Sequence, residues 1–324
     1  MIQNHSEEGV YSANTFQRQT LIRNGCKLSY GDVEGVYGWT LEQDVIHEGD
    51  LVLLDDTLDL NGYSLTITGD LVQVSGVVKL NGGQLNVDGD YRMQSRSGEE
   101  GAYTYGSSSG LLQMTNAEDY VLIKGSYISD SASNTTTHLT EGTLEIKGDV
   151  TVGNAYSNYS FVTTGNHVLL LSGEGIQNIN VNSSNASYSK VANLKIRNTS
   201  EAGVVFGKTL HITGNVNDHG NKVTGYIGIE NTTKFTENCF AGSVYVGQNI
   251  VMAEDLIIGG DLNLSSSTEV KGNILVKGNC AQYSYLYMNN GRLEIEGNYT
   301  VTSYSELRMQ QLWYGQRQGK EDSR

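Results

Sequence analysis

Residues 58–71 have the sequence LDLNGYSLTITGDL, and residues 78–91 have the sequence VKLNGGQLNVDGDY. The two stretches match without a gap at an offset of 20 residues, with apolar residues, Asn-Gly pairs and Gly-Asp pairs at equivalent positions. The same unit returns near the end of the chain, where residues 286–299 have the sequence LYMNNGRLEIEGNY. Internal repeats of about 20 to 50 residues are typical of solenoids and repeat arrays. The chain is therefore expected to be a repeat protein.

Each unit is predicted to contain short strands joined by tight bends. Apolar and polar residues alternate in stretches such as Leu65-Thr-Ile67, which is the period of a β-strand. Pairs such as Asn61-Gly62 separate these stretches and supply residues that accept a positive φ at a bend. A few bends per unit turn the chain through a full circle, so that each unit pairs in parallel with the last, about 4.8 Å above it. The predicted inward stacks are Leu58 on Val78, Leu60 on Leu80, Leu65 on Leu85 and Ile67 on Val87.

The pattern thus predicts an all-β fold, a single-stranded parallel β-helix (β-solenoid) with rungs of about 20 residues. We expect the coil to be right-handed, because parallel crossover connections generally are. The alternative is a row of antiparallel β-sandwich domains, in which the Asn-Gly pairs would mark hairpins. Hairpins do not require a fixed offset between units, so the solenoid is the preferred prediction.

The repeat also predicts the limits of the regions. Residues 1–37 show no clear period and are expected to be an N-terminal cap or linker, residues 38–310 the solenoid, and residues 311–324 a polar tail. Shorter copies of the unit begin at Val121, Leu144, Leu210, Leu256 and Ile274, and a last half-rung is expected at Leu307-Arg-Met309. Polar excursions around residues 95–109, 131–137 and 182–189 are expected to be loops at the corners.

Composition agrees with a thin, turn-rich structure. Of 324 residues, 38% are hydrophobic, 39 are Gly and none is Pro, which cannot donate to a sheet ladder. Acidic residues outnumber basic residues by 36 to 21, for a net charge of −15. Nucleic acid and anionic lipid both require basic surfaces, so neither is an expected partner. Excess negative charge is expected to keep the rod in solution.

Cysteine usage and the termini bear on location. Cys26, Cys239 and Cys280 lie far apart and form neither a disulfide framework nor a zinc motif. The chain carries no signal-peptide pattern and no apolar stretch long enough to insert into a bilayer. Two interpretations remain: a cytosolic protein, or part of a larger exported protein whose export signal lies elsewhere.

Several stretches resemble a known group of proteins. Gly38-Trp-Thr-Leu41, Gly142-Thr-Leu-Glu-Ile-Lys-Gly-Asp149 and Leu194-Lys-Ile-Arg-Asn198 are similar to segments of repetitive bacterial surface or secreted proteins, notably those of clostridia. The resemblance covers about residues 38–310. It implies a parallel β-helix stalk in an adhesin-like protein, mostly without a defined activity, and an extracellular or cell-surface location. It supplies no catalytic residues.

An acidic column is the first candidate site. Asp50, Asp70 and Asp90 would stack on successive rungs, as carboxylates do in some β-helix glycosidases and lyases, or would share a calcium ion. Later copies carry Asp149, Asn215, Asp261, Asn279 and Asn298 at the same place. Because Asp and Asn interchange, we favour a role in the turn, where either side chain bonds the local backbone, over proton transfer.

A second acidic group and the histidines are further candidates for a cation site. Asp55, Asp56 and Asp59 cluster without the spacing of a known calcium loop, and a solvated corner is the preferred interpretation. The histidines, which have no metal-ligand spacing, are His5, His47, His138, His167, His211 and His219. His211 is predicted to point outward. His47 aligns with inward Ile67, so it is either buried or a sign that the first rung is out of register.

Tyrosine is unusually frequent, with 20 residues against 5 Phe and 2 Trp. Tyr283, Tyr285 and Tyr287 alternate along a predicted strand, which would place them on one face as a contact surface for sugar rings or a partner protein. The alternative is that stacked tyrosines stiffen adjacent rungs. Further tyrosines in the polar loops are Tyr103, Tyr105, Tyr156, Tyr159 and Tyr188.

The sequence favours a non-enzymatic structural or adhesive module, a rigid stalk or display surface of a bacterial cell-surface or secreted protein. Its contacts would be a glycan or protein ligand on the extracellular side; no cofactor or metal is expected, and the oligomeric state stays open. The alternatives are a β-helix carbohydrate-active enzyme (a polysaccharide lyase or hydrolase) and an intracellular polymer-forming scaffold of the bactofilin type.

Overall fold

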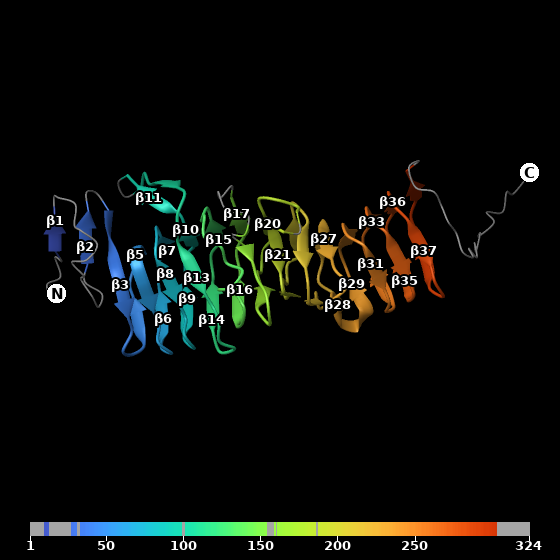
Figure 1. Ribbon diagram of the computed structural model, residues 1–324. Coiled ribbons are helices and arrows are strands. Elements are labelled where there is room, and N and C mark those ends of the chain that lie inside the picture. The colour runs from blue at the N-terminus through green and yellow to red at the C-terminus, as the bar shows by residue number, and fades with distance from the viewer. Residues whose placement is uncertain are drawn as a thin grey trace, which may run out of the picture.

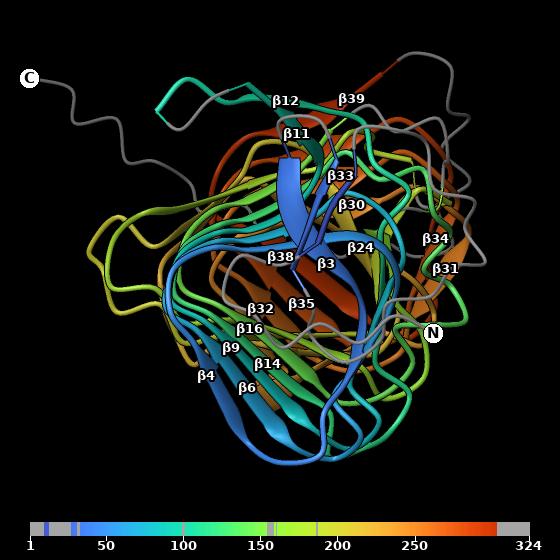
Figure 2. The same ribbon diagram turned by 90° about the vertical axis from the view of Figure 1, so that its left-hand side faces the viewer.

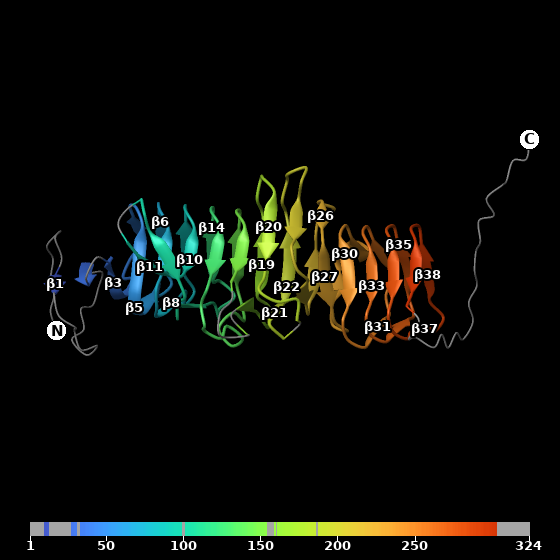
Figure 3. The same ribbon diagram turned by 90° about the horizontal axis from the view of Figure 1, so that it is seen from above.

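The protein is an elongated β-solenoid in which short strands coil around a single long axis (Figure 1, Figure 3). It has about 13 turns of roughly 20 residues. The computed structural model describes residues 10–12, 27–30, 33–98, 101–153, 159, 161–185 and 187–302, with side chains from residue 38 onward. The predicted fold class is confirmed. The hand of the coil stays a prediction.

One turn of the coil contains three strands, and equivalent strands of successive turns pair in parallel. In the turn that carries the repeat unit these are β6 (Ser64–Ile67), β7 (Leu71–Gln73) and β8 (Val77–Lys79). The next turn stacks β9 (Gln84–Val87) on β6 and β10 (Tyr91–Met93) on β7. Seen end-on, the turns overlie one another around a common interior (Figure 2).

Two long sheets run through the first two thirds of the rod. The nine-stranded sheet contains β6, β9, β4 (Val45–His47), β14 (Tyr120–Ile123), β16 (Thr143–Ile146), β19 (Val168–Leu171), β22 (Asn193–Ile196), β25 (Asn215–Asn217) and β28 (Lys234–Phe235). The thirteen-stranded sheet contains β7, β8, β10, β1 (Val10–Ser12), β2 (Lys27–Tyr30), β3 (Val33–Thr40), β5 (Leu51–Asp59), β13 (Leu111–Gln113), β15 (Tyr127–Ser129), β17 (Val150–Val152), β20 (Gln177–Asn180), β23 (Val204–Phe206) and β26 (Val223–Thr224).

Three further sheets carry the rod to its described end. The eight-stranded sheet contains β18 (Phe161–Val162), β21 (Ser189–Val191), β24 (Leu210–Ile212), β27 (Tyr226–Ile229), β30 (Ser243–Val246), β33 (Leu262–Leu264), β36 (Cys280–Gln282) and β39 (Tyr299–Val301). The four-stranded sheet contains β29 (Cys239–Phe240), β32 (Leu256–Ile258), β35 (Asn273–Val276) and β38 (Arg292–Ile295), and the three-stranded sheet β31 (Ile250–Met252), β34 (Thr268–Val270) and β37 (Leu286–Met288). A short 3-10 helix, η1 (Thr236–Asn238), precedes β29.

The interior is a continuous apolar column built by stacking equivalent side chains. The predicted pairs Leu58–Val78, Leu65–Leu85 and Ile67–Val87 lie opposite one another in the ladders, and Leu60 and Leu80 are buried with them. All of these side chains are fully buried, which stabilises the fold by roughly 1.5–3 kcal/mol for each large aliphatic residue. Because the partners come from neighbouring turns, no turn can bury its core alone.

The repeat unit does not keep to one face of the coil. Gly69-Asp70 leads from the nine-stranded sheet into the thirteen-stranded sheet, whereas Gly260-Asp261 leads from the four-stranded into the eight-stranded sheet. The copy beginning at Leu210 lies in the eight-stranded sheet and leads into β25 of the nine-stranded sheet. The turn length also changes, from 20 residues in the first turns to 18 near the end. The repeat unit therefore encodes a corner between two strands, and copies of it occur at all three corners of the coil.

The predicted loops leave the coil at its corners. The first contains an antiparallel hairpin, β11 (Ser95–Ser97) with β12 (Thr104–Gly106), which lies outside the coil (Figure 1). At the N-terminal end β3 crosses the predicted boundary after residue 37 and pairs in parallel with β5. The three-region division stays a prediction, and the predicted half-rung at Leu307–Met309 and the tail at residues 311–324 lie outside the described residues.

Candidate functional site

The column of Asp50, Asp70 and Asp90 is a hydrogen-bonded ladder between turns. Asp50 Oδ1 accepts the backbone N–H of Asp70 at 2.9 Å, and Asp70 Oδ1 accepts that of Asp90 at 2.7 Å. The glycines before the second and third aspartates lie against the turn below: a Cβ on Gly69 would lie 2.6 Å from the carbonyl carbon of Gly49, and a Cβ on Gly89 would lie 2.8 Å from that of Gly69. The Gly-Asp pair thus needs its glycine for close approach and its aspartate for the ladder.

The ladder explains why the residue type at this corner varies. The ladder continues through the following turns. Asp90 accepts the backbone N–H of Ser126, the Ser126 hydroxyl accepts that of Asp149, and the Asp149 carboxylate accepts that of Asn178. A second ladder near the end of the rod runs from Ser243 to Asp261, Asn279 and Asn298. Any side chain with an oxygen acceptor fits, which accounts for the interchange of Asp and Asn. The predicted bond to the local backbone is wrong, because the bonded N–H group belongs to the next turn.

Two arginines clamp the outer side of the acidic column. Arg92 pairs with Asp90 and, at 3.4 Å, with Asp70 Oδ2, while Arg96 Nη1 lies 3.1 Å from Asp50 Oδ2. The carboxylates thus bind backbone N–H groups through Oδ1 and guanidinium groups through Oδ2. These contacts favour a structural role for the three carboxylates over a catalytic pair or a calcium site.

The hairpin β11–β12 holds these arginines in place. The Arg96 guanidinium lies 4.2 Å from the ring centroid of Tyr103, and that of Arg92 lies 4.7 Å from the ring centroid of Tyr105. Cation–π contacts of this kind favour a fixed guanidinium position. Sequence reasoning missed the clamp. Its signal is the spacing of Arg92 and Arg96 just after the third aspartate, followed by two alternating tyrosines.

The second acidic group also serves its corner. Asp55 Oδ1 accepts the hydroxyl of Ser75 at 3.2 Å, and Asp59 Oδ1 accepts the backbone N–H of Asn61 at 2.8 Å. Asp56 has a φ of 68°, in the left-handed region. Among the residues that the structure describes, no three His, Cys, Asp or Glu side chains lie close enough together to hold a metal ion.

The prediction that His211 points to solvent is wrong. Its side chain is only 4% exposed, and its Nε2 lies 2.9 Å from the carbonyl oxygen of Ser184. The polar loop that contains Ser184 covers the outward face of β24, and the Tyr245 ring packs edge-on against the imidazole at 6.1 Å. Burial lowers the pKa of His211. Alternation along a strand gives the side of the sheet, but it cannot tell whether another segment covers that side.

Two other histidines differ in their surroundings. His47 lies opposite Ile67 in the ladder, so the predicted register of the first turn is right, and its ring is half-buried with Nε2 3.0 Å from the Asp50 carbonyl oxygen. His167 is fully buried, and its Nδ1 lies 2.9 Å from the carbonyl oxygen of Glu141. Burial lowers the pKa of His167 to about 4, so its imidazole is neutral at pH 7.

The three tyrosines near the end of the rod are exposed, but they do not share one strand as predicted. Tyr287 lies in β37, whereas Tyr283 and Tyr285 lie in the corner between β36 and β37. Their exposed fractions are 50% for Tyr283, 42% for Tyr285 and 45% for Tyr287. The rings of Tyr285 and Tyr287 are within 24° of parallel, with centroids 6.2 Å apart. A corner separates β36 from β37 here, so the alternation of the tyrosines does not mark one continuous strand.

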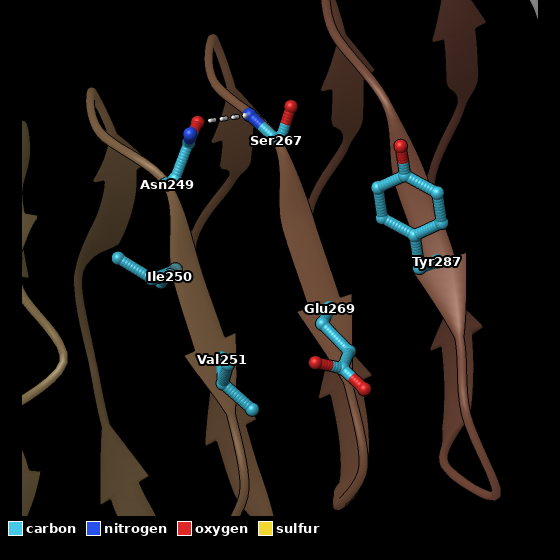
Figure 4. A pocket seen from close by; sticks show the side chains of 6 residues that line it. All are labelled: Asn249, Ile250, Val251, Ser267, Glu269 and Tyr287. Atoms are coloured by element: carbon cyan, nitrogen blue, oxygen red, sulfur yellow. Dashed lines mark hydrogen bonds between the residues drawn. The ribbon is translucent and has the colours of Figure 1, made fainter.

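An open depression of about 240 Å³ lies beside Tyr287 on the three-stranded sheet (Figure 4). Its lining residues are Asn249, Ile250, Val251, Ser267, Glu269 and Tyr287. Asn249 Oδ1 accepts the backbone N–H of Ser267 at 3.2 Å, and Glu269 Oε1 accepts the Asn289 amide at 2.8 Å. The Asn289 amide, with Lys271, holds the pKa of the Glu269 carboxyl below its usual range. We call Tyr285, Tyr287, Glu269, Val251 and Asn249 the tyrosine–glutamate surface.

Comparisons with models of known protein families, with curated proteins and with solved structures give no match. No helix within the described ranges has the length and apolar character needed to cross a membrane. The resemblance to repetitive bacterial surface proteins therefore stays an expectation from the sequence.

Proposed function

We propose that this chain is a non-enzymatic rod, a rigid stalk or display module of a bacterial cell-surface or secreted protein. The observation that carries the proposal is the ladder of side chains between turns. In the first turns the carboxylates that resemble a catalytic column, such as Asp70, bind the backbone of the next turn and an arginine. Charged groups used in this way stiffen the corners of a long coil, which is what a spacer requires.

The proposed contacts lie on the surface of the rod. The tyrosine–glutamate surface offers exposed aromatic rings beside polar side chains, and Tyr283 extends the exposed aromatic area around the corner. Exposed aromatic groups of this kind favour recognition of a glycan or a protein on the extracellular side. The proposed location rests on the resemblance of residues 38–310 to bacterial surface proteins.

Three assays on the purified chain test the proposal against its rivals. Binding to bacterial or host cells and to immobilised glycans is measured, together with release of reducing or unsaturated ends from a broad polysaccharide panel and with sedimentation at micromolar concentration. A display rod is expected to bind without cleaving any polysaccharide and to stay in the supernatant. Release of sugar ends would favour the carbohydrate-active enzyme, and pelleting filaments would favour the polymer-forming scaffold.

A further inference from the structure

We propose that the tyrosine–glutamate surface binds an uncharged oligosaccharide, with two neighbouring sugar rings stacked on Tyr285 and Tyr287 and their hydroxyls bonded by Glu269 and Asn249. This inference rests on the proposed function, because it names the ligand class and the site of a display rod. The argument uses the geometry of the rings, the polar groups beside them and the charge of the chain.

The aromatic rings form a platform and not a stiffening pair between turns. In the ladder Tyr287 lies opposite Glu269, and Glu269 lies opposite Val251, so no aromatic residue stacks on Tyr287 from the turn below. Stabilisation by aromatic pairs across strands therefore does not account for Tyr287. Its near-parallel neighbour is Tyr285, two residues earlier in its own turn. Figure 4 shows the Tyr287 ring face-on above the strand, beside the depression.

Two exposed, near-parallel tyrosine rings in one turn can each present a face to a sugar ring. The C–H face of a pyranose is flat and apolar, and a tyrosine ring presents a flat apolar face with a polar end. The depression beside Tyr287 is open and not enclosed, so a polymer could enter and leave it along the surface. Val251 supplies a further exposed apolar contact in the same row.

The polar groups beside the rings supply both a donor and an acceptor. The contacts of Glu269 to Asn289 and Lys271 both use Oε1, so Oε2 of the carboxylate keeps acceptor capacity for sugar hydroxyls. Asn249 uses its Oδ1 for the Ser267 N–H, which leaves its amide NH2 as a donor. A few polar groups placed around an apolar platform are the usual composition of small-ligand sites.

Charge selects among the glycans. The chain has a net charge of −15, and an ionised carboxylate, Glu269, lies at the centre of the surface. Like charges across an interface disfavour binding and slow association, so polysaccharides rich in uronate, sulfate or phosphate are poor ligands. The observations favour an uncharged oligosaccharide over an anionic one.

The test is calorimetric titration of the full chain with uncharged hexasaccharides: gluco-, xylo-, manno- and N-acetylglucosamine oligomers of defined linkage. We expect at least one series to bind, and Tyr287→Ala and Tyr285→Ala each to weaken it by about tenfold or more. Tyr287→Phe keeps the ring and should bind nearly as the parent does. Glu269→Gln should weaken binding by a few-fold. Tyr63→Ala removes an exposed tyrosine from the first turns and is the matched control.

The outcomes separate this inference from the proposed function. Binding of cells by the parent chain without binding of any uncharged oligosaccharide, or binding that Tyr287→Ala leaves unchanged, would overturn the tyrosine–glutamate site and leave the display rod standing. Stronger binding to anionic or amine-bearing glycans than to uncharged ones would also overturn it. Cleavage of the oligosaccharides during titration would overturn the display rod itself. Urea unfolding of each variant checks that the fold is intact.

Discussion

In the first turns of the rod the Gly-Asp corners recur every 20 residues and place three carboxylates above one another, at Asp50, Asp70 and Asp90. In the last turns the corners recur every 18 or 19 residues, and the ladder runs from Asp261 through Asn279 to Asn298. Within the part of the chain that the structure describes, the first ladder carries arginines on its outer side and the second does not. Stacked carboxylates repel one another and need a compensating charge, whereas amides need none. The two regions thus use one hydrogen-bond pattern with different electrostatics.

The same two regions differ in how their surfaces are covered. The hairpin β11–β12 covers the acidic corner of the first turns, and its tyrosines contact the clamping arginines. In the last turns Tyr285 and Tyr287 remain exposed. An aromatic residue near a corner is thus used in two ways in this fold: in the first turns it fixes charges, and in the last turns it leaves a ring exposed, which we propose is for a ligand.

The largest expected effect concerns the core. Leu85 is fully buried between two turns, whereas Leu293 lies in the last described turn and is half-buried. Leu85→Ala should lower the free energy of unfolding by about 2–5 kcal/mol, and Leu293→Ala should lower it by clearly less, because a cavity costs most where it cannot collapse. Urea unfolding followed by circular dichroism measures both. Equal losses would contradict a core that depends on neighbours on both sides.

The next effect is acid sensitivity in the middle of the rod. Burial lowers the pKa of His167 from 6.5 to about 4, so the unfolded chain takes up its proton first as the pH falls. Stability that is complete above pH 6.5 is therefore lost as the pH falls towards about 4, by ~3 kcal/mol at most. His167→Gln should flatten the dependence of the urea midpoint on pH between 7 and 4, and the exposed-site control His219→Asn should not. A His167→Gln variant with the slope of the parent would refute this assignment.

A smaller effect tests the clamp. Arg92→Ala removes the guanidinium shared by Asp70 and Asp90, and we expect a loss of about 1 kcal/mol, because the pairs are partly exposed. Asp70→Asn in the Arg92→Ala background should recover part of the loss, because an amide keeps the ladder acceptor without the charge. Thermal unfolding of the two variants measures the difference. If Asp70→Asn makes the Arg92→Ala variant still less stable, repulsion in the column is not what the clamp offsets.

The smallest expected effect comes from a substitution that introduces the stacked carboxylates of the first turns into the last turns. Asn279→Asp places a carboxylate directly above Asp261 without an arginine beside it. We expect a loss of about 0.5 kcal/mol at low salt, which disappears as salt screens the pair. Asn279→Ser keeps an oxygen acceptor without charge and is the matched control. A salt-independent loss, or an equal loss in the serine variant, would break the comparison between the two ladders.

The sequence predicts the part of this structure that depends on local pattern. The alternation of Leu65 and Ile67 and the offset to Leu85 identify strands, stacking and register correctly. The burial of His211 was not predictable, because a loop from another turn covers it. The corner between Tyr285 and β36 was missed for a related reason: the repeat of 20 residues shortens to 18, and the sequence unit moves to another corner.

For the candidate site, the repeat and the alternation in the sequence predicted which residue types are involved, but not which groups they contact. The interchange of Asp and Asn indicated that Asp70 bonds backbone and not a proton-transfer partner, but it did not indicate that this backbone belongs to the next turn. The clamp by Arg92 needs the path of a loop, which alternation does not contain. Likewise, the exposed tyrosines were found from sequence, but the position of Glu269 beside Tyr287 follows only from the ladder that stacks two turns 18 residues apart.

The most direct test of the stacked coil is a pair of spin-label distances along the nine-stranded sheet. Thr66, Lys195 and Asn217 occupy the same outward position in β6, β22 and β25. Lys195 lies five strand spacings from Thr66, and Asn217 lies six. With the native cysteines replaced and labelled cysteines at these sites, the stacked coil predicts separations of about 24 Å for the first pair and about 29 Å for the second, at about 4.8 Å per step. Distances that do not increase from the first pair to the second, or that are close to those of a compact particle, would contradict a single continuous stack.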